Sequence, residues 1–376
     1  MTAGIKLSTY ATMNAYNKRK IKVCYILSYR DPNYIRTQSI LNALRESDHF
    51  DVDVAINHHR DFLRYFDTIY KLFFIKRQRN PDVFILGFRG HEIYWPVRWI
   101  VGNKKIIFDA LMSPYSALHD DKKNGRVGVM LSVIWRGFEA GILKNADFIL
   151  TDTFLHESYY QKQFLIPPEK LNSIPVGAIT IVPESSSESL WCRDFSVLFY
   201  GSFLPLHGID IIIDAASKLI DLPVRFDFIG GSSAQAKRLN EQCKKNGVKN
   251  YTYQYWTPYN RLIAEVIPNA SLCLGGPFGG TPQARRVITG KTSQCLALKK
   301  ATIIGEIDTE VNFIDGENCL LVEQRNPNAL AEKIRWCYKN KDRLTEIGEK
   351  GYILYEKELS VSVIKNRLEK IIGNIE

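Results

Sequence analysis

The chain has no clustered cysteines, no apolar run long enough to cross a bilayer and no recognisable leader. Its seven cysteines stand singly along 376 residues, without the spacing of a zinc site or a disulfide framework. We interpret them as reduced core thiols, because Cys24 and Cys273 lie in strand-like apolar runs. Residues 1–20 lack the apolar segment of a signal peptide. These absences predict a cytoplasmic protein.

Acidic residues are outnumbered by basic ones, and the net charge is +10. This excess favours anionic partners: phosphates, an acidic membrane surface or nucleic acid. No helix-turn-helix, zinc-finger or aromatic RNA-binding signature is visible, and the charge is spread along the chain. We therefore expect no nucleic-acid partner, and a basic nucleic-acid-binding protein stays only as an alternative.

Short apolar runs alternate with helical patterns through the first half of the chain. The strand-like runs are residues 22–28, 50–56, 82–87, 105–108 and 148–151, and the helical patterns include 34–46, 60–79 and 127–144. Such alternation is typical of a parallel sheet that helices cover on both faces.

A polar stretch at residues 183–189 interrupts this pattern, which then restarts. Strand-like runs follow at 196–200, 225–229, 271–274 and 301–304, with helical patterns at 210–219, 291–299 and 327–340. We predict an α/β protein of two Rossmann-like, doubly wound domains, 1–185 and 186–355. An amphipathic helix over 356–376 is expected to pack back on the first domain. Facing domains of this kind bind ligands in the cleft at the carboxyl ends of their strands.

A glycine-rich loop follows the strand that ends at Leu274. Its glycines leave backbone N–H groups free to approach an anion. Arg285, Arg286 and Lys291 add positive charge, and Lys291 stands near a helix start, where backbone amides favour phosphate. The sequence predicts a diphosphate site here. The alternative is a solvated basic loop beside an ordinary turn.

The same stretch, FGGTPQARRVITGKTSQCLALKKATI over residues 278–303, resembles the donor-binding region of the retaining family 4 (group 1) glycosyltransferases. Within this family the stretch is most similar to a subgroup whose loop has the form FGxTPxAxRVIPNKxxQALAxGKPVI. The resemblance extends over 197–210, 312–322 and 326–334, and so covers most of 195–340. It is weaker in the first half, at 87–91, 108–109 and 174–178.

The resemblance implies a GT-B fold and transfer of a sugar, with retention, from a nucleotide-sugar donor. The implied enzyme is a hexosyltransferase, and its acceptor a saccharide or lipid-linked saccharide in polysaccharide or glycoconjugate synthesis. No cofactor or metal is expected, and no aspartate pair of the DxD type ends a strand. The alternative with the same fold is a non-hydrolysing sugar-nucleotide 2-epimerase.

The resemblance also implies which residues bind the donor, although two family positions differ. Gln294 stands at the second glutamate of the family's ExxxxxxxE motif and Arg286 eight residues before it, while Ser202 and His207 replace an Arg and a Lys. We expect Arg286 and Lys291 to neutralise the pyrophosphate and Gln294 to bind the ribose; an inactive, degenerate member is the alternative. The predicted donor site is Gly201, Ser202, His207, Gly230, Phe278, Gly279, Gly280, Thr281, Arg286, Lys291 and Gln294.

Polar residues also follow the strands of the first domain. His91 and Asp109 lie at carboxyl ends of strands and are candidate catalytic residues, and Tyr29 and Arg30 are candidate acceptor contacts. Each could instead cap a local turn.

The basic, aromatic segment 60–79 has apolar residues at helical spacing. Two interpretations stay open for it. It forms a core-facing helix, or it contacts anionic lipid headgroups at the inner membrane face.

Overall fold

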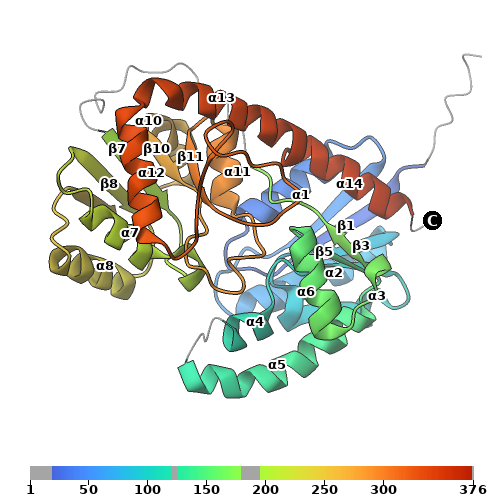
Figure 1. Ribbon diagram of the computed structural model, residues 1–376. Coiled ribbons are helices and arrows are strands. Elements are labelled where there is room, and N and C mark those ends of the chain that lie inside the picture. Colours follow the sequence, from blue (N-terminus) through green and yellow to red (C-terminus); the bar gives the residue numbers. More distant parts are fainter. Residues whose placement is uncertain (1–18, 121–124, 179–194, 375–376) are drawn as a thin grey trace, which may run out of the picture.

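The computed structural model describes residues 19–120, 125–178 and 195–374, which form two α/β domains (Figure 1). The first contains a parallel sheet of order β2-β1-β3-β4-β5-β6. Its strands are β1 (Ile21–Leu27), β2 (Phe50–Ile56), β3 (Val83–Leu86), β4 (Lys105–Asp109), β5 (Phe148–Thr151) and β6 (Leu171–Ser173). Its helices are α1 (Ile35–Arg45), α2 (Leu63–Gln78), α3 (Tyr94–Val101), α4 (Pro114–His119), α5 (Gly125–Asn145) and α6 (Phe154–Phe164).

The second domain repeats this plan in a parallel sheet of order β12-β11-β10-β7-β8-β9. Its strands are β7 (Phe195–Tyr200), β8 (Val224–Ile229), β9 (Tyr251–Gln254), β10 (Leu272–Leu274), β11 (Thr302–Gly305) and β12 (Leu320–Val322). Helices α7 (Ile209–Ser217), α8 (Ser233–Lys245), α11 (Gly290–Ala297), α12 (Pro327–Lys339) and α13 (Lys341–Glu358) accompany it. The short elements α9 (Tyr259–Arg261), η4 (Leu262–Val266) and α10 (Ile267–Asn269) lead into β10.

The central strands are buried on both faces, which explains their continuous apolar runs. β3 and β10 are buried at every position. In the first domain α2, α3 and α5 share one core with one face of the sheet, and α1 shares the other core with α14 (Val361–Gly373). The predicted doubly wound α/β fold with two domains is therefore confirmed.

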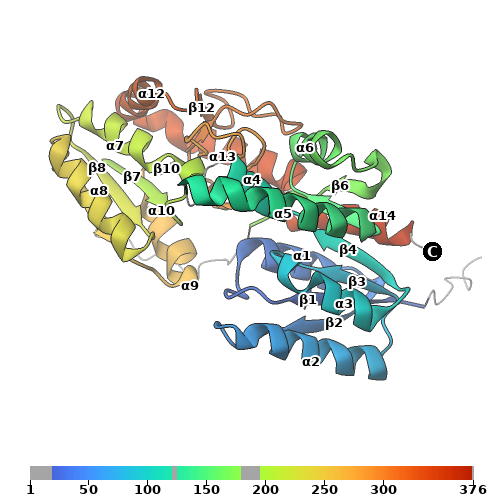
Figure 2. The same ribbon diagram turned by 90° about the horizontal axis from the view of Figure 1, so that it is seen from below.

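The C-terminal segment returns to the first domain. Helix α13 leads away from the second sheet and α14 ends beside α1 (Figures 1 and 2). Ser47 Oγ donates a hydrogen bond of 2.6 Å to Glu369 Oε1, and Arg367 Nη1 donates one of 2.9 Å to the Ser173 carbonyl. The pattern predicted as one helix from residue 356 is the end of α13 plus α14, with a break at Leu359 and Ser360. The expected boundary at 185/186 lies outside the described residues.

The six described cysteines are free and buried. Cys24 lies in β1 and Cys273 in β10, and burial raises the pKa of the Cys337 thiol to about 12. They act as small apolar residues of the core.

A buried ion pair joins α1 to the sheet of the first domain. Arg36 and Asp109 have fully buried side chains, and Arg36 Nη2 lies 3.1 Å from Asp109 Oδ1. Arg36 also donates to the carbonyls of Thr151 and Pro175, both at 3.1 Å. The pair thus ties α1, β4, β5 and the segment after β6 together. This placement argues against the candidate catalytic role of Asp109, because its carboxylate is buried and committed to Arg36.

Replacing Asp109 with Asn should destabilise the protein strongly. The variant leaves the buried Arg36 guanidinium without its ion-pair partner, which costs on the order of 3–5 kcal/mol. The Tm and the free energy of unfolding in urea measure this change. Asp221→Asn is the control, because it removes the solvent-exposed Arg335–Asp221 pair, which contributes little to stability. Equal effects of both variants would contradict the structural role of Asp109.

Candidate functional site

A cavity of about 360 Å³ lies between the two domains. The first domain lines it with residues that follow β1, β3, β4 and β5, and the second with the turn after β7 and the start of α11. The cavity therefore lies where the carboxyl ends of both sheets meet, the usual ligand position in open α/β sheets. Its polar lining residues include Asp31, Asn33, Asp152, Ser202, His207, Tyr259, Gln283, Thr289 and Lys291.

Lys291 is the cation of this cavity. Thr289 caps α11 by accepting from the Thr292 N–H, which places Lys291 in the first helical turn. Only 7% of Lys291 is exposed, and its ammonium lies against Gly201 and 5.3 Å from the centre of the Phe199 ring. Within the described chain no carboxylate forms an ion pair with it. Burial lowers the pKa of Lys291 to about 7, so an anion in the cavity would supply the missing counter-charge.

The turn after β7 faces Lys291, and its residues Gly201, Ser202 and His207 line the cavity. A His207 ring nitrogen contacts the Ser202 carbonyl. Burial, and then the nearby Lys291 charge, hold the pKa of His207 well below its usual value, so its ring is neutral near pH 7. Gly230 lies behind this turn with φ of +110°, where a Cβ would lie 2.2 Å from the Gly201 carbonyl oxygen. Gly230 therefore supports the turn and does not line the cavity.

The glycine-rich loop has a different place from the one expected. The Gly279 N–H donates to the Leu206 carbonyl at 2.9 Å, and a Cβ there would lie 2.0 Å from the Pro205 carbonyl oxygen. Phe278 is a core residue and Gly280 packs on Arg325. Thr281, too, lies outside the cavity lining and caps Ala284. Residues 278–281 thus hold the segment around Leu206 and His207 in place. In this structure none of these residues lines the cavity, and the Gly279 amide is already hydrogen-bonded.

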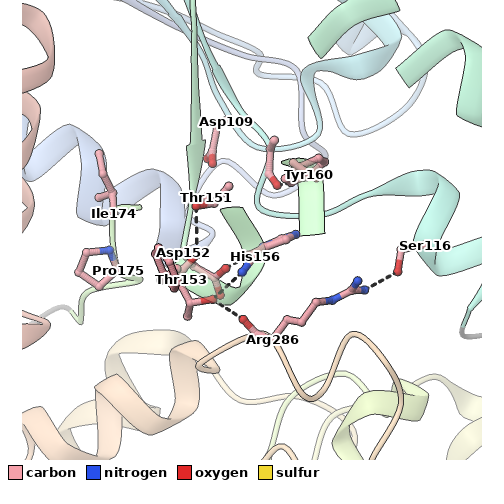
Figure 3. Close-up of polar contacts among 12 residues, drawn as sticks. Asp109, Ser116, Thr151, Asp152, Thr153, His156, Tyr160, Ile174, Pro175 and Arg286 are labelled. Atoms are coloured by element: carbon pink, nitrogen blue, oxygen red, sulfur yellow. Dashed lines mark hydrogen bonds and ion pairs between the residues drawn. The ribbon is translucent and has the colours of Figure 1, made fainter. Parts of the chain in front are cut away.

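Arg286 points across the gap to the first domain (Figure 3). Its Nη2 donates to Ser116 Oγ at 2.7 Å and lies 3.7 Å from an Asp120 oxygen, and its guanidinium stacks 3.7 Å from the Tyr159 ring centre. The Thr153 hydroxyl also donates to the Arg286 carbonyl. Arg286 therefore forms an interdomain contact in this structure and does not line the cavity beside Lys291.

Gln294 and Tyr29 do not line the cavity but contact residues that do. Gln294 is fully buried and its Oε1 accepts from the Tyr259 hydroxyl at 2.5 Å. Tyr29 packs edge-on against Tyr34 and Phe88, both of which line the cavity.

Arg30 and His91 also lie outside the cavity lining. His91 is buried against Phe108, and burial lowers its pKa to about 3, so its ring is neutral. The exposed Arg30 is followed by Asp31 and Asn33, which do line the cavity.

Asp152 is a cavity residue that the sequence did not single out. It directly follows β5, and its Oδ1 lies 2.8 Å from His156 Nδ1 in the first turn of α6 (Figure 3). The signal that could have found it is the one used for Asp109, an acidic residue at the carboxyl end of a strand. Only the structure shows that Asp109 is turned toward Arg36 while Asp152 reaches the cavity.

Across residues 19–120, 125–178 and 195–374 no group of three His, Cys, Asp or Glu side chains has the geometry to hold a metal ion. In the same ranges no helix combines the length and apolar character that a membrane span needs.

Comparison with known proteins gives matches for the second domain and for the whole fold. Residues 194–340 match the family described as "Glycosyl transferases group 1". An uncharacterized glycosyltransferase of Methanocaldococcus jannaschii is 30% identical over 161 residues, which are 41% of this chain and 41% of that relative. The match thus spans less than half of the curated relative.

Two solved structures resemble nearly the whole chain. HepE of Anabaena in complex with UDP and glucose has a TM-score of 0.69 at 12% identity, covering 94% of this chain and all of HepE. Sucrose-phosphate synthase of Thermosynechococcus elongatus has a TM-score of 0.73 at 14% identity, covering 95% of this chain and 99% of that chain. The chain as a whole therefore has the GT-B fold, and its second domain matches the group 1 glycosyl transferases.

Proposed function

We propose that the protein is a glycosyltransferase that moves a sugar from a nucleotide-sugar donor to a saccharide or lipid-linked acceptor. The observation that carries this proposal is the buried Lys291 ammonium, which faces the interdomain cavity at the start of α11 without a carboxylate partner among the described residues. The family match of the second domain supports it, as does the likeness to HepE, whose structure was solved with UDP and glucose.

In the proposed reaction the bond between the sugar carbon and the diphosphate oxygen breaks while the oxygen of an acceptor hydroxyl bonds to the same carbon, and the proton of that hydroxyl passes to the leaving diphosphate. Negative charge grows on the leaving diphosphate, and a fixed cation stabilises that charge without rearranging. Lys291 and the backbone amides of the first turn of α11 would supply this stabilisation. We expect the transfer to need no metal or other cofactor. We also propose that a hexose is transferred with retention, which proton NMR of the anomeric signal tests.

A nucleotide-sugar screen tests the function and the role of Lys291 together. The Tm of the wild-type protein should rise in the presence of one class of nucleotide sugar, because a ligand that binds only the folded state stabilises it. Lys291→Met should lose most of this gain while its unliganded Tm stays equal or rises, because a buried charge is removed. Ile220→Gln on the exposed surface is the control. A donor-induced shift unchanged in Lys291→Met would refute the placement, and a C2 epimer formed without acceptor would indicate an epimerase.

The affinity for a nucleoside diphosphate should depend on pH through Lys291. Its pKa is about 7 in the free protein, and a bound diphosphate raises that pKa because it favours the charged ammonium. Affinity should therefore fall roughly tenfold per pH unit as pH rises above about 7. Calorimetry between pH 7.5 and 9 measures this slope. Lys291→Met supplies the reference, and an equal slope in that variant would contradict the assignment.

We further propose that the protein works in the cytoplasm, peripherally bound to an anionic membrane that carries its acceptor. Large apolar side chains are exposed on α2, α3 and α5, among them Phe66 (68%), Trp99 (87%) and Met130 (76%). These helices lie on the same side of the first sheet, and Trp95 of α3 lies against Gly141 of α5. Arg64, Lys76 and Arg77 give α2 positive charge beside its apolar residues. This combination is typical of helices that lie in a lipid interface.

Vesicle sedimentation tests the membrane proposal. Wild type should bind vesicles containing phosphatidylglycerol, more weakly at high salt, and should not bind purely zwitterionic vesicles. The double variant Met130→Gln/Ile134→Gln on α5 should bind several-fold more weakly. Ile220→Gln/Ile353→Gln removes equally exposed apolar residues from the second domain and should have no effect. Equal binding by both double variants would contradict this surface.

A further inference from the structure

Asp152 has a buried carboxylate, one oxygen of which lacks a hydrogen-bond partner among the described residues. The residue is only 3% exposed, and its Oδ1 lies 2.8 Å from His156 Nδ1. Its Oδ2 is buried and has no hydrogen-bond partner in the described part of the chain. A buried, unsatisfied carboxylate oxygen is costly, and Asp152 lines the interdomain cavity. A ligand in that cavity that donates a hydrogen bond would remove the cost.

The surroundings of Asp152 hold it in one orientation. His156 is itself buried, and its ring stacks on Tyr160 with centroids 5.0 Å apart. Thr153, the next residue, caps α6 and donates to the Arg286 carbonyl of the second domain. The position of Asp152 is therefore fixed from both domains, as a specific binding group requires.

The charges in the cavity indicate which part of a ligand Asp152 meets. Lys291, on the second-domain side, attracts phosphate, whereas the Asp152 carboxylate repels it. Asp152 must then face an uncharged part that carries hydrogen-bond donors. In a nucleotide sugar the group attached to the diphosphate is a sugar, and its hydroxyls are such donors.

We infer that Asp152 binds a hydroxyl of the sugar being transferred, and that His156 is its positioning residue. This inference rests on the proposed function and deepens it. It assigns the first domain a part in donor recognition, opposite the cation that binds the diphosphate. Recognition of the sugar would then require both domains to be in contact.

The test compares the affinity for a nucleotide sugar with the affinity for its free nucleoside diphosphate. Wild-type protein is screened with UDP-glucose, UDP-N-acetylglucosamine, UDP-galactose and GDP-mannose, and calorimetry then gives the Kd of the preferred donor and of its diphosphate. Asp152→Asn should raise the Kd of the nucleotide sugar roughly tenfold, as expected for a lost hydrogen bond to a charged group. Asp152→Ala should raise that Kd further. The Kd of the diphosphate should stay within about twofold.

Two further variants separate positioning from folding. His156→Phe keeps a ring stacked on Tyr160 but removes the nitrogen that holds Asp152. It should raise the Kd of the nucleotide sugar and leave the Kd of the diphosphate unchanged. His156→Asn, whose amide can replace Nδ1, should restore part of that loss. Asp147→Asn is the matched control, because Asp147 precedes β5 at the opposite end of the strand and pairs with Arg98 and Lys105.

The outcomes distinguish this inference from the function on which it rests. If wild type binds neither nucleotide sugars nor diphosphates, the proposed function fails and the inference falls with it. If wild type binds a nucleotide sugar and Asp152→Asn binds it equally well, the function stands and the inference is overturned. If Asp152→Asn weakens the binding of the nucleotide sugar and of the diphosphate equally, Asp152 shapes the whole cavity, and the assignment of Asp152 to the sugar is likewise overturned.

Discussion

A buried ammonium that faces a gap between two domains is the constraint on which the site depends. Lys291 has lost most of its hydration, and in the described chain it gains no carboxylate in exchange. Desolvation favours the neutral amine, so the free protein holds this group near its titration point at neutral pH. An anionic ligand shifts the balance back to the charged form. The cavity thus leaves room for an anionic group beside Lys291, and we propose that this group is the diphosphate of the donor.

The rest of the fold keeps that ammonium in place. The glycine-rich loop does not touch the cavity, yet its tight packing on Pro205 and Leu206 fixes the segment that carries His207. In the first domain the Arg36–Asp109 pair joins the elements whose ends form the opposite wall. Arg286 reaches between the domains and stacks on Tyr159. Groups of opposite charge are thereby held on the two sides of one cavity.

Much of the fold could be predicted from the sequence, because both sheets are parallel and buried and their strands form apolar runs between helical patterns. Predicted strands such as 50–56 and 148–151 match β2 and β5. Helix α8 was missed because it is largely polar, although its capping box of Ser232 and Gln235 was a usable signal. The pattern placed Lys291 at a helix start, where the structure has it.

The direction of individual side chains could not be predicted. Asp109 and Asp152 both end strands, and what separates them is the contact of Asp109 with Arg36, 73 residues away. Arg286 and Lys291 are close in sequence but have different surroundings: Arg286 contacts Ser116 and Tyr159 of the first domain, whereas Lys291 lies in the first turn of α11 and lines the cavity. Spacing identifies candidates, whereas tertiary contacts decide which of them reach the cavity.

The most direct test of the account is a crystal structure of the protein with a bound nucleoside diphosphate. We predict phosphate oxygens within hydrogen-bond distance of the Lys291 ammonium and of the first backbone amides of α11, between the two sheets. Clear density for the diphosphate elsewhere, with the Lys291 ammonium still lacking an anionic partner, would contradict it.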